Sequence, residues 1–151
     1  MRVLYYDCFS GISGDMNLGA LLDLGVDETH LRGELSKLGL NEHFMLEVSL
    51  ASTMGISGTK VTVRLMQKWH TQAHHHVHRT FQDIKTIITR SALSYAIKER
   101  SLKMFWLVAV AEGKIHGKSP DEVGFHEVGA IDSIVDIVGA AIGLDWLKVD
   151  R

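Results

Sequence analysis

The spacing of hydrophobic and polar positions changes several times along the chain, and these changes predict the elements of the fold. The segment RVLYYD, which has a four-residue apolar run before Asp7, predicts a short strand that ends at Asp7. MNLGALLDLG and the stretch from Asp27 to about Leu38 have helical spacing, and Asp27 is a suitable N-terminal cap for the second helix. Gly25 and Gly39 are expected to end these two helices.

Two further segments alternate with period two and predict a β-hairpin, because a glycine-bearing TMGISG turn separates them. The expected inward positions are Phe44, Leu46, Val48 and Leu50 in the first strand and Val61, Val63 and Leu65 in the second. From about Thr80 onward the spacing is helical, and apolar stripes are expected to face the core. The stripes are Ile97, Met104, Phe105, Val108 and Ile115, and then Ile131, Ile134, Val135, Val138, Ile142 and Trp146. The predicted class is α+β, with a short N-terminal strand, two helices, a hairpin and a helical C-terminal half.

Composition and charge narrow the classes of function. The 151 residues, 46% of them hydrophobic, suffice for one domain with a sizeable core. A net charge of -2 gives no electrostatic basis for binding nucleic acid or an anionic membrane. The lone cysteine, Cys8, fits a reducing compartment, and no apolar run is long enough for a signal peptide or a membrane span. We therefore expect a cytoplasmic protein that binds neither nucleic acid nor a membrane.

A histidine tract, WHTQAHHHVHRT, lies in the middle of the chain and forms an expected loop over about residues 69–80. It contains His70, His74, His75, His76 and His78. Imidazole nitrogen suits zinc, copper, nickel and iron, and alternate residues of an extended segment share a face. His74, His75, His76 and His78 are therefore predicted metal ligands, and the alternative is a solvated polar loop.

A second candidate is the turn DCFSGISGD, which runs from Asp7 to Asp15 between the expected strand and helix. Glycines and a helix start allow backbone N–H groups to approach an anion. The candidate nucleotide- or cofactor-binding residues are Asp7, Ser10, Gly11, Ser13, Gly14 and Asp15. Two alternatives stay open: the two carboxylates hold a hard divalent cation, or Ser13 or Asp15 simply caps the helix. The P-loop pattern is absent.

A third candidate lies between Glu112 and Asp136. Glu112 and His116 are four residues apart and share a face of a helix, and the segment FHEVGAIDSIVD follows. The predicted metal or substrate ligands are His116, His126, Glu127 and Asp132. Adjacent helices joined by a loop of this length usually pack antiparallel, which can bring these groups to one end of the pair. The alternative is a buried, hydrogen-bonded histidine beside solvated acids. Gly139, Ala140 and Gly143 allow another backbone or a ligand to come close.

Together these motifs resemble the LarC family of nickel-insertion proteins. The resemblance rests on LYYDCFSGISGDMNLGALLDLGVD, the tract ending HVHRTFQDI, and KIHG…FHEVGAIDSIVDIVGAAIGLD, and it extends through the chain in order. It implies that Ni²⁺ is inserted into pyridinium-3,5-bisthiocarboxylic acid mononucleotide, giving the nickel-pincer nucleotide of lactate racemase-type enzymes. The implied enzyme is a cyclometallase of lyase type that forms a carbon–nickel bond and uses CTP with Mn²⁺ or Mg²⁺. The histidine tract would be its nickel store.

The resemblance also implies a missing part. Family members are longer, and their nucleotide binding is attributed to a C-terminal domain that this chain does not contain. We therefore expect residues 1–151 to be one N-terminal nickel-binding domain that is inactive alone and works with that domain in cis or in trans. Other expected partners are the nucleotide substrate, a second copy of the chain and a nickel-pincer-dependent apoenzyme. Thr71, Gln72 and Ala73 interrupt the tract. Two alternatives stay open: a metal-storage or metal-delivery module without chemistry, and a phosphate-handling metal hydrolase built on Asp7 and Asp15.

Overall fold

The computed structural model describes residues 1–66, 79–125 and 130–150. Its elements are α1 (Gly14–Asp23), α2 (Glu28–Ser36), β1 (Phe44–Thr53), β2 (Ile56–Leu65), β3 (Arg79–Thr80), α3 (Phe81–Arg90), α4 (Tyr95–His116), β4 (Gly124–Phe125) and α5 (Ile131–Trp146). Helices and two antiparallel strand pairs, β1–β2 and β3–β4, confirm the α+β class. None of the helices in the described ranges is both long enough and apolar enough to cross a membrane.

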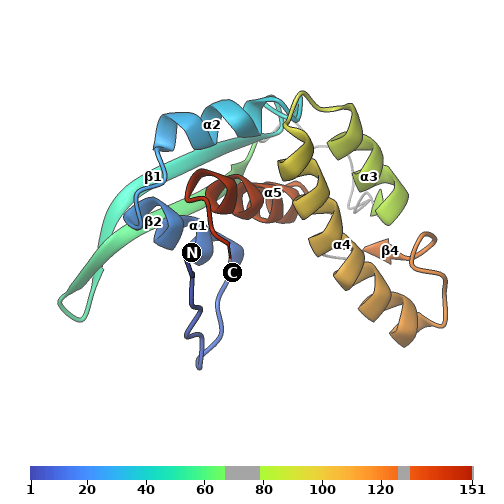
Figure 1. Ribbon diagram of the computed structural model, residues 1–151, viewed down its shortest axis with the longest axis horizontal. Helices are drawn as coiled ribbons and strands as arrows, with labels where there is room; N and C mark the ends of the chain where they lie inside the picture. The colour runs from blue at the N-terminus through green and yellow to red at the C-terminus, as the bar shows by residue number, and fades with distance from the viewer. Residues whose placement is uncertain (67–78, 126–129, 151) are drawn as a thin grey trace.

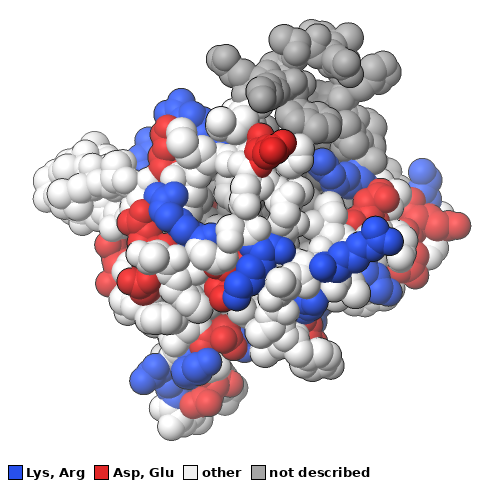
Figure 2. All heavy atoms as spheres, turned by 90° about the horizontal axis from the view of Figure 1, so that it is seen from above, with Lys and Arg blue, Asp and Glu red and all other residues white. Residues whose placement is uncertain are grey.

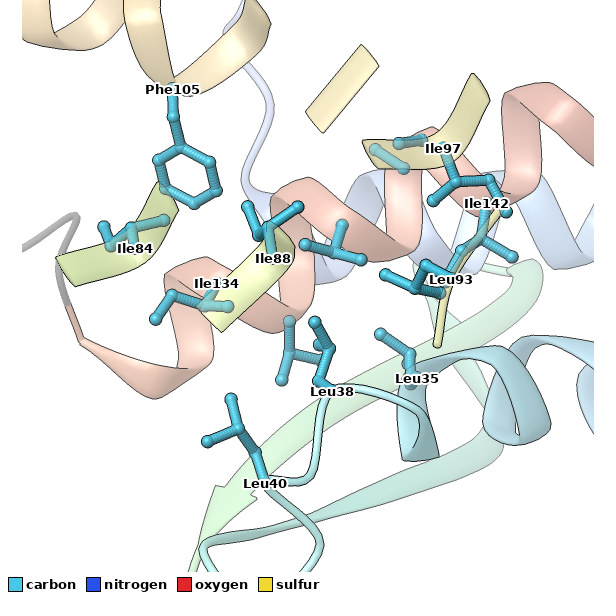
Figure 3. Close-up of a cluster of buried hydrophobic side chains, with 14 of the residues drawn as sticks. Leu35, Leu38, Leu40, Ile84, Ile88, Leu93, Ile97, Phe105, Ile134 and Ile142 are labelled. Atoms are coloured by element: carbon cyan, nitrogen blue, oxygen red, sulfur yellow. The ribbon is translucent and has the colours of Figure 1, made fainter. Parts of the chain in front are cut away.

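Helix α5 occupies the centre of the fold. Figure 1 shows it with α1 and the β1–β2 hairpin on one side and α3 and α4 on the other. In Figure 3, Ile134 and Ile142 of α5 lie among buried side chains that come from α3, α4 and the end of α2. Arg100, near the start of α4, donates to the carbonyl of Ala141 at 3.4 Å and lies 3.9 Å from Oδ1 of Asp145. The start of α4 therefore meets the end of α5, and this pair is antiparallel, as expected.

Helices α1 and α5 run parallel and pack closely through glycines. A Cβ atom at Gly139 would lie 2.7 Å from Cδ2 of Leu18, and one at Gly143 would lie 2.8 Å from Cδ1 of Leu21. A Cβ at either position would require the facing leucine side chain to shift, so the glycines allow α1 and α5 to pack this closely. The order of these contacts along both helices shows that their N-termini lie at the same end. The close approach expected at the small residues of α5 is therefore made by another helix, α1.

The predicted ends of α1 and α2 are confirmed by their local chemistry. The side chain of Asp27 accepts a hydrogen bond from the backbone N–H of His30 at 2.7 Å, which caps α2. Gly25 and Gly39 follow the two helices with φ values of +101° and +71°. This left-handed backbone conformation favours glycine, so each helix ends where the sequence predicts.

The predicted hairpin is also confirmed, with a two-residue turn at Met54 and Gly55, where both φ values are positive. Some expected core residues are nevertheless exposed: Leu50, Leu65, Ile115 and Trp146. Leu50 lies toward the tip of the hairpin and Ile115 lies in the last turn of α4, where these elements extend past their neighbours. The tip of the hairpin is uncharged from Val48 to Thr59 and forms the white projection at the left of Figure 2. Elsewhere on that face, acidic and basic side chains are interspersed.

The prediction of an N-terminal strand ending at Asp7 is wrong. Residues 1–8 are extended but form no strand. The backbone of Arg2 makes two hydrogen bonds with Asp150. Its N–H donates to the side-chain Oδ2 at 2.7 Å, and its carbonyl accepts from the Asp150 N–H at 2.9 Å. Beyond these bonds no described strand lies alongside the segment, and Tyr5 is 82% exposed. The short apolar run was suited to a strand, but a strand also needs a hydrogen-bonded neighbour.

Candidate functional site

The first turn of α1 lies against α5, so two motifs that are far apart in the sequence meet. A Cβ atom at Gly14 would overlap the carboxylate of Asp136. Asp15 follows Gly14 in the first turn of α1, and Asp132 lies one turn before Asp136 in the first turn of α5. We call Asp15, Asp132 and Asp136 the carboxylate cluster. It joins the DCFSGISGD turn to the third candidate stretch.

Negative charge is concentrated in the carboxylate cluster. Burial of the Asp136 side chain, followed by the nearby carboxylates of Asp15 and Asp132, raises the pKa of Asp136 to about 6. Oδ1 of Asp136 is buried and accepts no hydrogen bond within the described part of the chain. Asp15 and Asp132 each accept a backbone N–H of their own first turn, from Met16 at 2.9 Å and from Ser133 at 2.8 Å. A cation would offset the negative charge of Asp136, whereas the carboxylates of Asp15 and Asp132 add to it.

The geometry of the Asp7–Asp15 turn bears on its predicted role in nucleotide binding. Gly11 has a φ of +85° and shapes the turn, while Asp7 and Ser10 are exposed to solvent. Ser13 occupies the cap position of α1, but its hydroxyl donates to the carboxylate of Asp15 and makes no capping bond. A phosphate at this helix start would face the carboxylate cluster and be repelled. The arrangement therefore disfavours an anionic ligand at this helix start.

The third candidate stretch is divided by the structure. Nε2 of His116 lies 3.2 Å from Oε2 of Glu112 in the last turn of α4, as their spacing predicts, whereas Asp132 belongs to the carboxylate cluster. His126 and Glu127 lie outside the described residues. Over residues 1–66, 79–125 and 130–150, no three histidine, cysteine, aspartate or glutamate side chains are placed to hold one metal ion. The described residues therefore do not assemble the predicted ligand set.

The predicted ligands of the histidine tract, His74, His75, His76 and His78, also lie outside the described residues. The chain re-enters the described part at Arg79, which pairs with Phe125 in the β3–β4 ladder. Phe125 is bonded to His126 in the sequence. The ladder therefore holds Arg79, which follows His78, beside Phe125, which precedes His126.

Two grooves on the described surface are considered as ligand sites. The larger, about 620 Å³, lies between the first turn of α1 and hairpin residues 51–61. The smaller, about 410 Å³, lies between α3 and α4 and is lined by Phe81, Lys85, Leu102, Lys103, Trp106 and Asp121. Sequence reasoning missed this second groove. Its signals were the helical spacings of Phe81 with Lys85 and of Lys103 with Trp106, which place each lysine one turn from an aromatic residue.

Comparison with known proteins identifies the family. A family model described as nickel insertion protein matches residues 4–151. The chain belongs to the nickel insertion protein family. Three relatives are named pyridinium-3,5-bisthiocarboxylic acid mononucleotide nickel insertion protein. The protein of Clostridium kluyveri is 55% identical over 156 residues, covering 100% of this chain and 39% of the relative. Those of Akkermansia muciniphila and Acetivibrio thermocellus are 51% and 49% identical, each covering 37% of the relative and 99% and 100% of this chain.

This member of the nickel insertion protein family spans about two fifths of the length of these relatives. The match includes all three motifs, from the DCFSGISGD turn to α5. No solved structure matches the chain.

Proposed function

We propose that residues 1–151 form a nickel-binding domain that supplies Ni²⁺ for insertion into pyridinium-3,5-bisthiocarboxylic acid mononucleotide. The observation that carries this proposal is the match of the nickel insertion protein family to residues 4–151. Relatives named as nickel insertion proteins for this mononucleotide share about half of their residues with this chain over its whole length. Nickel is a substrate here, and the histidine tract collects it. Four clustered imidazoles, from His74, His75, His76 and His78, favour nickel over magnesium or calcium.

The carboxylate cluster has a second role in this proposal, as a cation-attracting station apart from the tract. Its three side chains come from two helix starts, and the buried Oδ1 of Asp136 has no hydrogen-bond partner within the described ranges. Carboxylate oxygen is a poorer ligand for nickel than imidazole nitrogen or a sulfur ligand. Nickel held here would remain easy to pass on to the thiocarboxylates of the nucleotide.

We further propose that CTP and Mn²⁺ or Mg²⁺ act through the part of the relatives that this chain does not span. The sequence has no P-loop, and the relatives extend well beyond the matched residues. Complete relatives would thus combine a nickel-supplying part with a nucleotide-activating part.

Replacing His74, His75, His76 and His78 together by alanine is expected to remove most nickel binding, as measured by calorimetric titration with metal analysis. Nickel affinity of the unaltered chain should fall as the pH drops through about 6.5, because protonated imidazole cannot bind a metal. Gln72→Ala is the matched control within the tract and should bind nickel normally. Equal nickel binding by the four-histidine variant would contradict the proposal.

Residues 1–151 alone are expected not to produce the nickel-pincer nucleotide. Adding the part of the Clostridium kluyveri relative that lies beyond the matched residues should restore nickel insertion in the presence of CTP, because the two parts together span one complete relative. The measurement is mass spectrometry of the nickel-containing nucleotide. CTP-dependent product from residues 1–151 alone would refute this division of roles, and nickel uptake without insertion in the completed mixture would favour a storage module.

A further inference from the structure

We infer that the groove between α3 and α4 binds the nucleotide substrate, with its pyridinium ring on Trp106 and its anionic groups at Lys85 and Lys103. The inference rests on the proposed function, which supplies a pyridinium mononucleotide as the substrate. The groove holds about 410 Å³, which is within the usual range for a small-molecule site of roughly 300–1,000 Å³.

The floor of the groove is aromatic. Phe81, the first residue of α3, is buried, and its ring centroid lies 5.3 Å from that of Trp106 on α4 in an edge-to-face arrangement. Trp106 remains 39% exposed, so part of its indole is open to the groove. An indole face attracts a cationic ring through its quadrupole. A pyridinium ring is therefore a better occupant of this floor than a neutral or anionic ring.

The rim of the groove is cationic on both helices. Lys85 lies one turn after Phe81 on α3, and Lys103 lies three residues before Trp106 on α4. Neither ammonium group has an ion pair or hydrogen bond with another residue of the described ranges. Both are free to meet a phosphate or a thiocarboxylate. Asp121, on the loop after α4, can accept hydrogen bonds from ribose hydroxyls.

The larger groove beside α1 is the competing location, and it fits this ligand less well. Its lining residues include no aromatic side chain, and its charged residues are Asp15 and Lys60. Asp15 belongs to the carboxylate cluster, which repels a phosphate. The α3–α4 groove, in contrast, begins at Phe81, three residues after His78. A nucleotide there would lie next to the point where the nickel-collecting tract joins the described fold.

Nicotinic acid mononucleotide is a suitable probe, because it has the same pyridinium ring, ribose and phosphate. Titration of the chain, followed by heteronuclear NMR, should shift the Trp106 indole signal and the amide signals around Phe81 and Lys103. Lys85→Ala and Lys103→Ala should each weaken binding about three- to tenfold through loss of a charged contact. Lys114→Ala is the matched control on α4, since Lys114 is exposed and lies outside the groove. Nicotinamide riboside, which lacks the phosphate, should bind more weakly than the mononucleotide.

Shifts confined to the groove between α1 and residues 51–61, equal weakening by Lys114→Ala, or no shift up to about 10 mM ligand would each overturn the inference. Spectra of the free variants show whether each remains folded. Nickel titration of the same proteins separates this inference from the proposed function. Lys103→Ala should bind nickel like the unaltered chain. If the unaltered chain binds nickel but no nucleotide, the groove assignment alone is overturned.

Discussion

Replacement of Gly19 by alanine is expected to destabilise the protein by about 3 kcal/mol, which corresponds to a fall in melting temperature of roughly 6–12 °C. Gly19 is buried in α1, and a Cβ atom there would overlap the backbone carbonyl oxygen of Thr59 on β2. A backbone atom cannot turn aside as a side chain can, so α1 would have to move away from the hairpin. The higher helix propensity of alanine returns only about 1 kcal/mol.

Gly33→Ala provides the matched control for this prediction. Gly33 also lies inside a helix, α2, but it is exposed and a Cβ atom there would meet nothing within 4 Å. This variant should be more stable by about 0.5–1 kcal/mol, because alanine restricts the unfolded chain and favours a helix. Thermal unfolding followed by circular dichroism checks both variants. A Gly19→Ala protein that melts at or above the temperature of the unaltered chain would show that α1 does not pack against β2 as described.

Asp136→Asn is expected to stabilise the protein at pH 7 while impairing nickel insertion by the completed system. The pKa of Asp136 is raised from 3.8 to about 6 by burial and by the carboxylates of Asp15 and Asp132. A shift of about two units would correspond to about 3 kcal/mol for a fully desolvated group, and solvent screening of this partly exposed side chain reduces the expected gain to about 1 kcal/mol. A loss of insertion rate of about 10- to 100-fold is expected if the carboxylate contacts nickel.

The stability gain should depend on pH in a defined direction. Because the folded-state pKa of Asp136 is above the unfolded value, the folded protein binds more protons between pH 4 and pH 6. The contribution of Asp136 to the free energy of unfolding is therefore greatest near pH 4 and is lost as the pH rises through about 6. The advantage of Asp136→Asn should be present at pH 7 and absent near pH 4.

Asp145→Asn is a control of opposite sign on the same helix. The Asp145 carboxylate lies 3.3 Å from Nζ of Lys148 and 3.9 Å from a guanidinium nitrogen of Arg100, so its loss should slightly destabilise the protein. Urea unfolding at both pH values provides the measurement. An Asp136→Asn protein with unchanged stability at pH 7 would argue against crowding in the carboxylate cluster. Increased stability with full insertion activity would mean that this carboxylate does not handle nickel.

The elements set by local chemistry were predictable from the sequence. Asp27 caps α2, Gly25 and Gly39 have the backbone conformation that glycine permits, and the hairpin turns at Met54 and Gly55. The prediction of a strand before Asp7 failed because a short apolar run describes one segment, whereas a strand requires a second segment hydrogen-bonded beside it. Leu50 and Ile115 were assigned to the core for a similar reason: periodicity identifies a face of an element but not how far that element extends past its neighbours.

The candidate site was predictable in its residue types and only partly in its arrangement. Asp15 and Asp132 were each recognised in a motif, but their common neighbour Asp136 depends on parallel packing of two helices about 120 residues apart, which no local pattern specifies. The groove of Phe81 and Trp106 was missed because aromatic residues at helical spacing usually indicate core. The assignments to the histidine tract, His126 and Glu127 remain predictions, since these residues lie outside the described ranges.

The pairing of α1 with α5 also affects how the protein is made. The ribosome delivers α1 first, yet the glycine-lined surface that receives Leu18 and Leu21 is translated only with α5. At roughly 5–20 residues per second, the 107 residues between Asp23 and Ile131 take about 5–20 s to synthesise. During that interval the apolar face of α1 has no α5 to cover it, and the emerging chain is exposed to aggregation and to chaperones. If translation stopped or paused for long before Ile131, the apolar face of α1 would remain without α5 to cover it.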